Sequence, residues 1–183
     1  MTVPASLRRK TIALVGLMGV GKSSIGRRLA HALDMTFIDA DSEIEKAAGC
    51  SISEIFERLG EPAFREGERR VISRLIDDGQ PHVLATGGGA FMNAETRELL
   101  KSRTVTVWLK ADIEVLARRV SRKDTRPLLT GRDPVEVLTR QAAERYPIYA
   151  EADLSIETGD TAHQVAVEAI LTALTAHLQA PAP

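Results

Sequence analysis

Residues 16–23, with the sequence GLMGVGKS, constrain the fold of this chain more than any other segment. They match the P-loop pattern, and they lie between an apolar run that ends at Val15 and a helical pattern that begins near Lys22. The glycines let the backbone curl with its amides toward a phosphate, and the following helix presents its positive dipole end to the same anion. The sequence therefore predicts a strand, a phosphate-binding loop and a helix, in that order.

The P-loop also predicts which side chains handle a nucleoside triphosphate. Lys22 can bridge the β- and γ-phosphates, which makes it a catalytic candidate, and the Ser23 hydroxyl can ligate Mg²⁺. The predicted nucleotide-binding residues of the loop are Gly19, Val20, Gly21, Lys22, Ser23 and Ser24. A glycine-rich turn without a ligand is the alternative, and the strand–loop–helix order argues against it.

A P-loop alone does not distinguish a switch GTPase, an ATP-driven motor and a kinase. The chain has no Asn-Lys-x-Asp motif for reading guanine, and its 183 residues are few for a motor domain. A small-molecule kinase is therefore favoured.

The formal net charge of -1 provides no general positive field for nucleic acid or an anionic membrane, so we expect neither as a partner. A single cysteine, Cys50, and the lack of an apolar signal or membrane segment lead us to expect a cytoplasmic protein.

Alternating strand and helix patterns predict the fold class. Five short apolar runs alternate with longer segments of helical periodicity, which indicates a parallel α/β protein. The runs are Thr11–Val15, Thr36–Ile38, His82–Ala85, Val105–Leu109 and Leu154–Ile156. We predict one P-loop kinase domain over residues 1–183, with helices on the sheet.

Two segments are predicted to be insertions that serve a substrate. Residues 41–78 indicate two or three helices, with breaks at Gly49–Cys50 and Gly60–Pro62, and with a capping box at Ser51 and Glu54. Residues 118–133 carry six basic and two acidic side chains, a local charge of +4. This second segment is either a solvated face or a lid that covers phosphates.

Acidic and glycine-rich segments follow the second and third predicted strands. Asp39 and Asp41 would emerge on the same side of an extended segment, where one could hold Mg²⁺ and the other could orient or deprotonate an attacking hydroxyl. The alternative for Asp41 is a helix N-cap. Gly87, Gly88 and Gly89 would let their backbone approach a ligand, or they form a plain tight turn.

Two arginines could bind a planar anion. Arg65 and Arg145 carry guanidinium groups, which bind carboxylates in a bidentate way, although most lone arginines are surface residues.

Taken in order, GLMGVGKSS, FIDAD, FRE, TGGGA, TRPLL and ERYPIYAEAD resemble the shikimate kinase family, from about Thr11 to Thr158. The resemblance implies transfer of the γ-phosphoryl group of ATP to the 3-hydroxyl of shikimate, in the chorismate route to aromatic amino acids. It also implies a five-stranded parallel sheet in the order 2-3-1-4-5, and a shikimate-binding role for the insertion at 41–78.

The resemblance further implies roles for individual residues. Asp41 would contact the substrate hydroxyls and accept the proton. Arg65 and Arg145 would hold the shikimate carboxylate, and Gly87, Gly88 and Gly89 would line the same pocket. Lys22 and Arg126 would stabilise the transferring phosphoryl group, with Arg126 brought in by the lid. Ser23, together with Asp39 through water, would hold Mg²⁺.

Arg119 matches, by its spacing from Arg126, the position that stacks on adenine in the family. The segment Gly159-Asp160-Thr161 departs from the family because it lacks the basic and proline residues expected in the adenine loop.

The alternatives to a shikimate kinase are a kinase for gluconate or for a nucleoside monophosphate, and a nucleotide-gated binding protein. An aromatic content of 4% provides few rings for stacking a second base. We expect a monomer.

Overall fold

The computed structural model describes residues 8–77, 79–121, 133–160 and 162–179. In these residues one parallel sheet has the strand order β2-β3-β1-β4-β5. Its strands are β1 (Thr11–Val15), β2 (Thr36–Asp39), β3 (His82–Ala85), β4 (Thr104–Lys110) and β5 (Leu154–Glu157). The predicted strand order is confirmed, and each predicted strand is present with at most one extra residue at an end.

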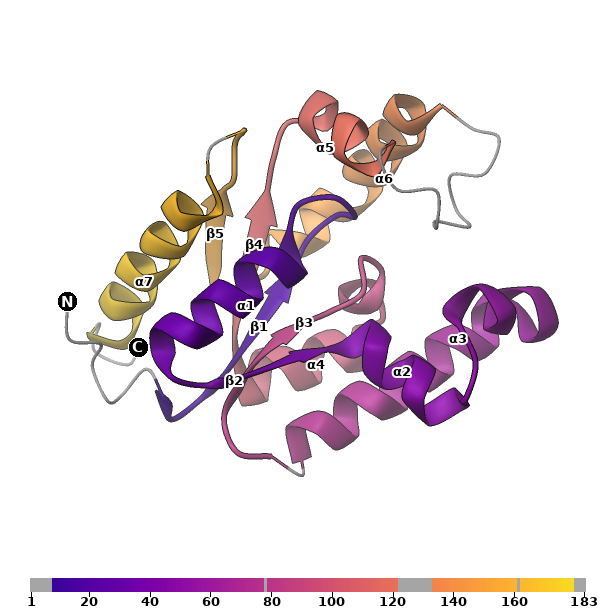
Figure 1. The fold of residues 1–183 in the computed structure, drawn as a ribbon, viewed down its shortest axis with the longest axis horizontal. Helices are drawn as coiled ribbons and strands as arrows, with labels where there is room; N and C mark the ends of the chain where they lie inside the picture. Colours follow the sequence, from indigo (N-terminus) through magenta and orange to yellow (C-terminus); the bar gives the residue numbers. More distant parts are fainter. Residues whose placement is uncertain (1–7, 78, 122–132, 161, 180–183) are drawn as a thin grey trace.

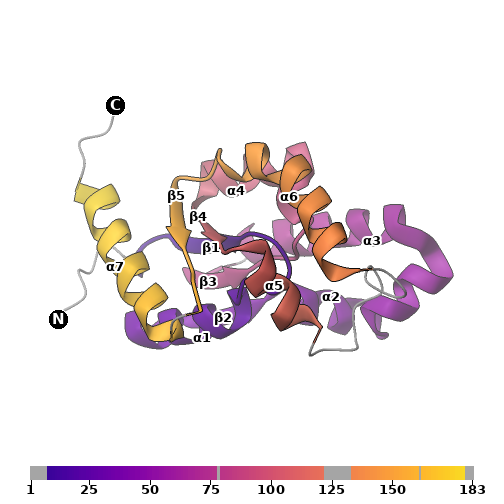
Figure 2. The ribbon, with the colours of Figure 1, turned by 90° about the horizontal axis from the view of Figure 1, so that it is seen from above.

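Helices cover both faces of this sheet. Figure 2 shows α1 and α7 on one side, and α4 and α6 on the other. The helices are α1 (Lys22–Leu33), α2 (Ala40–Ala48), α3 (Ile52–Asp77), α4 (Ala94–Arg103), α5 (Ile113–Val120), α6 (Pro134–Tyr149) and α7 (His163–Gln179), and a 3₁₀ turn, η2, spans Ala90–Met92. The predicted parallel α/β class is confirmed. Within the described residues, no helix combines the length and apolar character that crossing a bilayer requires.

The central strands β1 and β3 are buried along their whole length because both faces of the sheet are covered. Every residue of β1 and β3 is buried, and Leu14, Leu84 and Val107 have no exposed surface. From α1, Ile25 and Leu29 pack into the same core. The carboxyl ends of these strands are therefore held firmly in place.

The insertion between β2 and β3 consists of α2 and α3, which lie at one end of the molecule (Figure 1). The predicted breaks are present: Gly49 caps α2 with φ 68°, and Gly60 interrupts α3 with φ 79°. The capping box is confirmed, since the Ser51 amide donates to Glu54 Oε2 at 2.8 Å and the Glu54 amide donates to Ser51 Oγ at 3.2 Å. A second apolar cluster joins the two helices through Ile44, Ile55, Phe64 and Val71.

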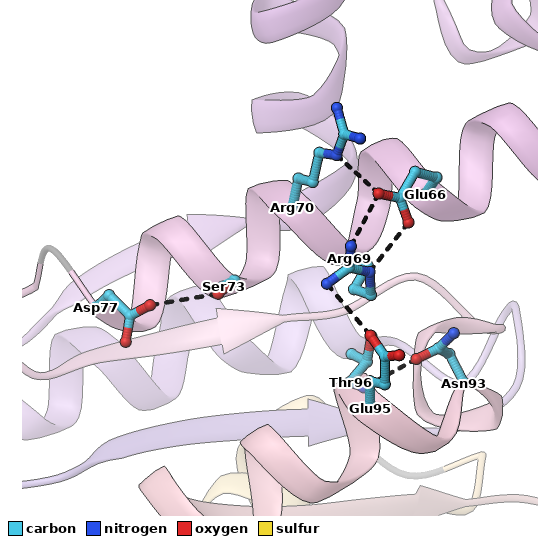
Figure 3. Close-up of polar contacts among 8 residues, drawn as sticks. All are labelled: Glu66, Arg69, Arg70, Ser73, Asp77, Asn93, Glu95 and Thr96. Carbon is cyan, nitrogen blue, oxygen red and sulfur yellow. Dashed lines mark hydrogen bonds and ion pairs between the residues drawn. The ribbon is translucent and has the colours of Figure 1, made fainter.

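Polar contacts connect α3 to α4 (Figure 3). Arg69 donates to Glu66 at 2.8 Å and lies 3.3 Å from the carboxylate of Glu95. Asn93 caps α4, because its Oδ1 accepts from the Thr96 amide at 2.9 Å. The insertion is thus attached to the helix that covers the sheet.

His82, the first residue of β3, is buried at the amino end of the sheet with 1% of its surface exposed. Its amide donates to Thr11 Oγ1 at 3.3 Å, and its Nδ1 lies 3.1 Å from the Gln80 carbonyl oxygen. Its Nε2 has no hydrogen-bond partner among the described residues. Burial lowers the pKa of His82, so the folded protein favours the neutral imidazole.

This environment predicts a pH-dependent stability. In the unfolded chain His82 takes up a proton near its ordinary pKa of about 6.5, whereas in the folded chain its pKa is lower. Protonation therefore favours the unfolded chain, and the free energy of unfolding falls as the pH drops below that value. We expect the wild type to lose up to about 1.4 kcal/mol per pH unit through this one group, and His82→Gln to lose correspondingly less. Urea denaturation between about pH 7.5 and 5.5 measures this difference. Identical pH slopes would exclude the effect.

Candidate active site

The candidate active site lies at the carboxyl edge of the sheet. The P-loop follows β1, Asp39 ends β2 and is followed by Asp41, and residues 86–89 follow β3. In open parallel sheets this is the edge where ligands bind. Because β3 lies beside β1 and β2 lies beside β3, segments that are distant in sequence meet here.

Left-handed glycines shape the P-loop. Gly16, Gly19 and Gly21 have φ values of 140°, 81° and 97°, which side chains rarely adopt. The Lys22 ammonium donates to the carbonyl oxygens of Gly16 at 2.8 Å and Leu17 at 3.0 Å, which places the charge inside the curve of the loop.

The loop leads directly into α1. Gly21 is the N-cap, and Lys22, Ser23 and Ser24 form the first turn, as predicted. Val20, with 1% of its surface exposed, packs into the core beneath the loop.

Asp39 is the residue that organises the end of β2. Its Oδ2 accepts from the Ser23 hydroxyl at 2.6 Å, and its Oδ1 accepts from the Asp41 amide at 3.1 Å. Asp39, not Asp41, is therefore the N-cap of α2, and the alternative for Asp41 is wrong. The expected extended geometry is also wrong, because α2 begins at Ala40 and places Asp41 in its first turn.

Three charged side chains approach the turn Gly87–Gly89, which we call the glycine turn. A Cβ at Gly89 would lie 2.6 Å from Cζ of Arg65. A Cβ at Gly87 would collide with Glu68 Oε1 and lie 3.1 Å from Asp41 Oδ1. The absence of side chains thus makes room for these groups.

Gly88, the middle residue of the glycine turn, faces the P-loop and α6. A Cβ there would lie 3.5 Å from the Met18 amide nitrogen. Its carbonyl oxygen accepts from Arg145 Nη1 at 2.9 Å and from the Tyr149 hydroxyl. Burial raises the pKa of Tyr149 to about 12, so this hydroxyl remains a donor at any physiological pH. The Tyr149 ring lies 5.9 Å from that of Trp108.

Arg65 is held by two carboxylates of α3. It donates to Glu68 Oε2 at 2.8 Å and to Glu61 Oε1 at 3.0 Å. The two partners differ in exposure: 3% of the Glu68 side chain is exposed, and 53% of that of Glu61. Burial raises the pKa of Glu68, and the adjacent Arg65 opposes that shift. Glu68 Oε1 has no hydrogen-bond partner among the described residues, and it faces the glycine turn.

On the other side of the P-loop, Arg119 and His163 approach each other from two helices. Arg119 Nη2 donates to the Gly159 carbonyl oxygen at 2.8 Å. The His163 ring at the start of α7 packs on the loop, because a Cβ at Gly21 would lie 3.4 Å from its Nε2. Burial lowers the pKa of His163, and the positive charges of Arg28 and Arg119 lower it further.

The structure brings most of the sequence-predicted site residues to this edge. This edge brings together Lys22, Ser23, Asp39, Asp41, Arg65, Arg145 and the glycine turn, and Arg119 is bound to Gly159, which follows β5. Arg126 and most of the predicted lid, residues 122–132, lie outside the described residues. Glu68, Tyr149 and His163 were not predicted. The i,i+3 spacing of Glu68 from Arg65 is a signal that could have identified it.

Comparison with known proteins identifies the family. A model of the family described as shikimate kinase matches residues 18–175. A shikimate kinase of Caulobacter vibrioides is 72% identical over 170 residues, which are 93% of this chain and 84% of the relative. The chain belongs to the shikimate kinase family. The resemblance read from the sequence is confirmed.

Solved structures agree with this assignment. Shikimate kinase from Acinetobacter baumannii, in complex with shikimate, superposes with a TM-score of 0.90 at 38% identity, covering 97% of this chain and 100% of that one. A gluconokinase from Sinorhizobium meliloti has a TM-score of 0.56 at 19% identity, covering 92% of this chain and 93% of that one, and so shares only the fold. As a member of the shikimate kinase family, the chain is an ATP-dependent kinase.

The P-loop geometry predicts the effect of a single methyl group. In Gly19→Ala the new Cβ would lie 2.7 Å from Cγ1 of Val120, on a residue with φ 81°. We expect the free energy of unfolding to fall by about 1–2 kcal/mol. Because the loop must also shift, ATP should bind about tenfold more weakly. Titration with ATP and urea denaturation measure the two effects.

Gly49→Ala is the matched control. Gly49 has a similar φ of 68°, but a Cβ there would meet no atom within 4 Å, and the residue caps α2 away from the P-loop. It should show the loss of stability with unchanged ATP affinity. Equal loss of ATP affinity in both variants would contradict the role assigned to Gly19.

Proposed function

We propose that this chain transfers the γ-phosphoryl group of ATP to the 3-hydroxyl of shikimate, giving shikimate 3-phosphate and ADP. The observation that carries the proposal is the convergence of Asp41, Arg65 and Arg145 on the glycine turn, directly beside the P-loop. A carboxylate-bearing polyol needs guanidinium groups at one end and a carboxylate near the reacting hydroxyl at the other, and this arrangement provides both.

Arg65 and Arg145 bind the shikimate carboxylate in this proposal. Hydrogen bonds to Glu68 and Glu61 orient the Arg65 guanidinium before a substrate binds. Arg145 is aimed by the Gly88 carbonyl oxygen. Asp41 accepts a hydrogen bond from the 3-hydroxyl and takes up its proton as the phosphoryl group is transferred.

The P-loop positions ATP and neutralises the transferring group. Lys22 bridges the β- and γ-phosphates, and Lys22 and Arg126 stabilise the charge on the transferring phosphoryl group, with Arg126 brought in by the lid, as the family resemblance implies. Ser23 and Asp39 fit a Mg²⁺ site, since their oxygens lie 2.6 Å apart and Mg²⁺ prefers one or two protein oxygens together with phosphate. Mg²⁺ held there would supply positive charge that offsets the negative charge of the phosphates.

Arg119 and His163 border the adenosine in this proposal. His163 packs on Gly21 of the P-loop and Arg119 is bound to the Gly159 carbonyl oxygen, whereas Arg65 and Arg145 lie at the glycine turn. A largely neutral imidazole and a planar guanidinium can each pack against a base. His163 thus provides a ring next to the segment that lacks the expected proline.

A coupled assay of ADP release tests the proposal. With ATP and Mg²⁺ present, shikimate should stimulate release by more than about tenfold, because bound acceptor converts a slow hydrolysis into an oriented transfer. Gluconate and nucleoside monophosphates serve as controls for the two rival kinases. Slow ATP hydrolysis that none of these compounds stimulates would support a nucleotide-gated binding protein and contradict the proposal. The monomeric state and cytoplasmic location remain predictions.

The two carboxylates around Arg65 predict a selective effect on the acceptor. Glu68→Gln removes the buried charge that aims Arg65, so we expect the KM for shikimate to rise by about tenfold or more. The KM for ATP should stay nearly constant, because Glu68 is bound to Arg65 and faces the glycine turn, on the acceptor side of the site. Steady-state kinetics with each substrate varied in turn measure both constants.

Glu61→Gln provides the matched control on the same arginine. More than half of the Glu61 side chain is exposed, so its ion pair is screened and its removal should raise the KM for shikimate by less than about fivefold. Equal effects of the two variants, or a rise in the KM for ATP alone, would show that Glu68 does not position Arg65.

A further inference from the structure

A cavity of about 590 Å³ lies between α2 and α3, away from the candidate active site. None of the described residues that are assigned to ATP or shikimate lines it. Its floor is the apolar cluster of Ile44, Ile55, Phe64 and Val71, which is buried from bulk solvent but borders the cavity. We call this cavity the α2–α3 groove.

Small side chains keep the α2–α3 groove open. Ala47, Ala48, Ala63 and Gly67 line it, and Leu59 lines it with 67% of its surface exposed. A Cβ at Gly67 would meet no atom within 4 Å, so the helix leaves free space at that position. The groove therefore offers an apolar surface of the size that binds small organic ligands, for which about 300–1,000 Å³ is usual.

Arginines dominate the charge of the groove. Arg58, Arg70 and Arg74 line it together with one carboxylate, that of Glu54. The Glu54 carboxylate is already occupied by the Ser51 amide and hydroxyl, which lower the pKa of Glu54. The groove thus combines an apolar floor with an excess of positive charge.

The arginines are not equally available to a ligand. Arg70 is paired with Glu66 at 2.8 Å (Figure 3). Within the described part of the chain, Arg74 makes no hydrogen bond or ion pair. An anion at the rim would gain a charge-assisted hydrogen bond from Arg74 without having to break an existing pair.

We propose that the α2–α3 groove binds a small hydrophobic carboxylate, with its apolar body on the floor and its carboxylate at Arg74. Of the lining arginines, Arg70 is paired with Glu66 and Arg58 helps to lower the pKa of Glu54. Among the described residues this leaves Arg74 to meet a ligand that carries a single negative charge. Shikimate itself is a poor occupant, because its hydroxyls would face four apolar side chains without hydrogen-bond partners. This binding site is separate from the candidate active site, and the proposal does not depend on the proposed kinase function.

Cys50 makes the proposal measurable, because it is the single cysteine of the chain and lines the groove half-buried. The rate at which a thiol reagent labels Cys50 is followed as biphenyl-4-carboxylate is added to the full-length protein. We expect saturable protection of at least about fivefold, and at least about tenfold weaker protection by neutral biphenyl-4-methanol, which lacks the charge.

Two variants locate the ligand. Gly67→Leu places a side chain into free space of the groove and should abolish the protection, and a leucine is a better helix former than glycine, so the variant should fold. Arg74→Gln should weaken binding of the carboxylate but not of the neutral analogue. Arg140→Gln, an exposed arginine of α6 outside the groove, is the matched control and should bind as the wild type does.

Isothermal titration with the same probes supplies a second measurement that does not depend on the thiol. The proposal is overturned if the carboxylate neither protects Cys50 nor binds by titration, if the neutral analogue binds equally well, or if Gly67→Leu retains wild-type affinity. Equal losses in Arg74→Gln and Arg140→Gln would overturn the role of Arg74 in the same way.

Discussion

The close approach of the glycine turn to the P-loop determines where every other group of the site can lie. Thr86, just before the turn, donates from its amide and its hydroxyl to the Leu14 carbonyl oxygen in β1, at 3.2 and 2.9 Å. This pairing extends the contact between β3 and β1 to the point where the P-loop begins. With no Cβ on Gly87, Gly88 or Gly89, the acceptor side of the site can lie within reach of the phosphates that the loop would hold.

The charges around the glycine turn stabilise one another before any ligand binds. Arg65 lies between a buried and an exposed carboxylate, and Arg145 is bound to a backbone carbonyl oxygen. A buried carboxylate such as Glu68 is costly unless it is paired, and here its partner is the guanidinium that the proposal assigns to the substrate. Fold stability and the orientation of the acceptor site therefore depend on the same ion pair.

Local patterns allowed a large part of this arrangement to be predicted. The P-loop was identified from its glycines, Lys22 and Ser23 because all of its chemistry lies in eight consecutive residues. The strands were predicted from their apolar runs, whereas their order came from the family resemblance. Asp41 was placed in an extended segment because its two-residue spacing from Asp39 fits a strand, and nothing local showed that α2 begins at Ala40. His163 could not be predicted, since only the folded chain brings it to Gly21.

Trp108 on β4 gives the molecule an internal optical reporter. It is the single tryptophan of the chain, and its ring lies 5.1 Å from that of Tyr146 and 5.9 Å from that of Tyr149, whose hydroxyl is bound to Gly88. The indole is thus two contacts away from the turn on which the acceptor site is built. Its emission can report rearrangements at that turn without any attached dye, against a background free of other tryptophans.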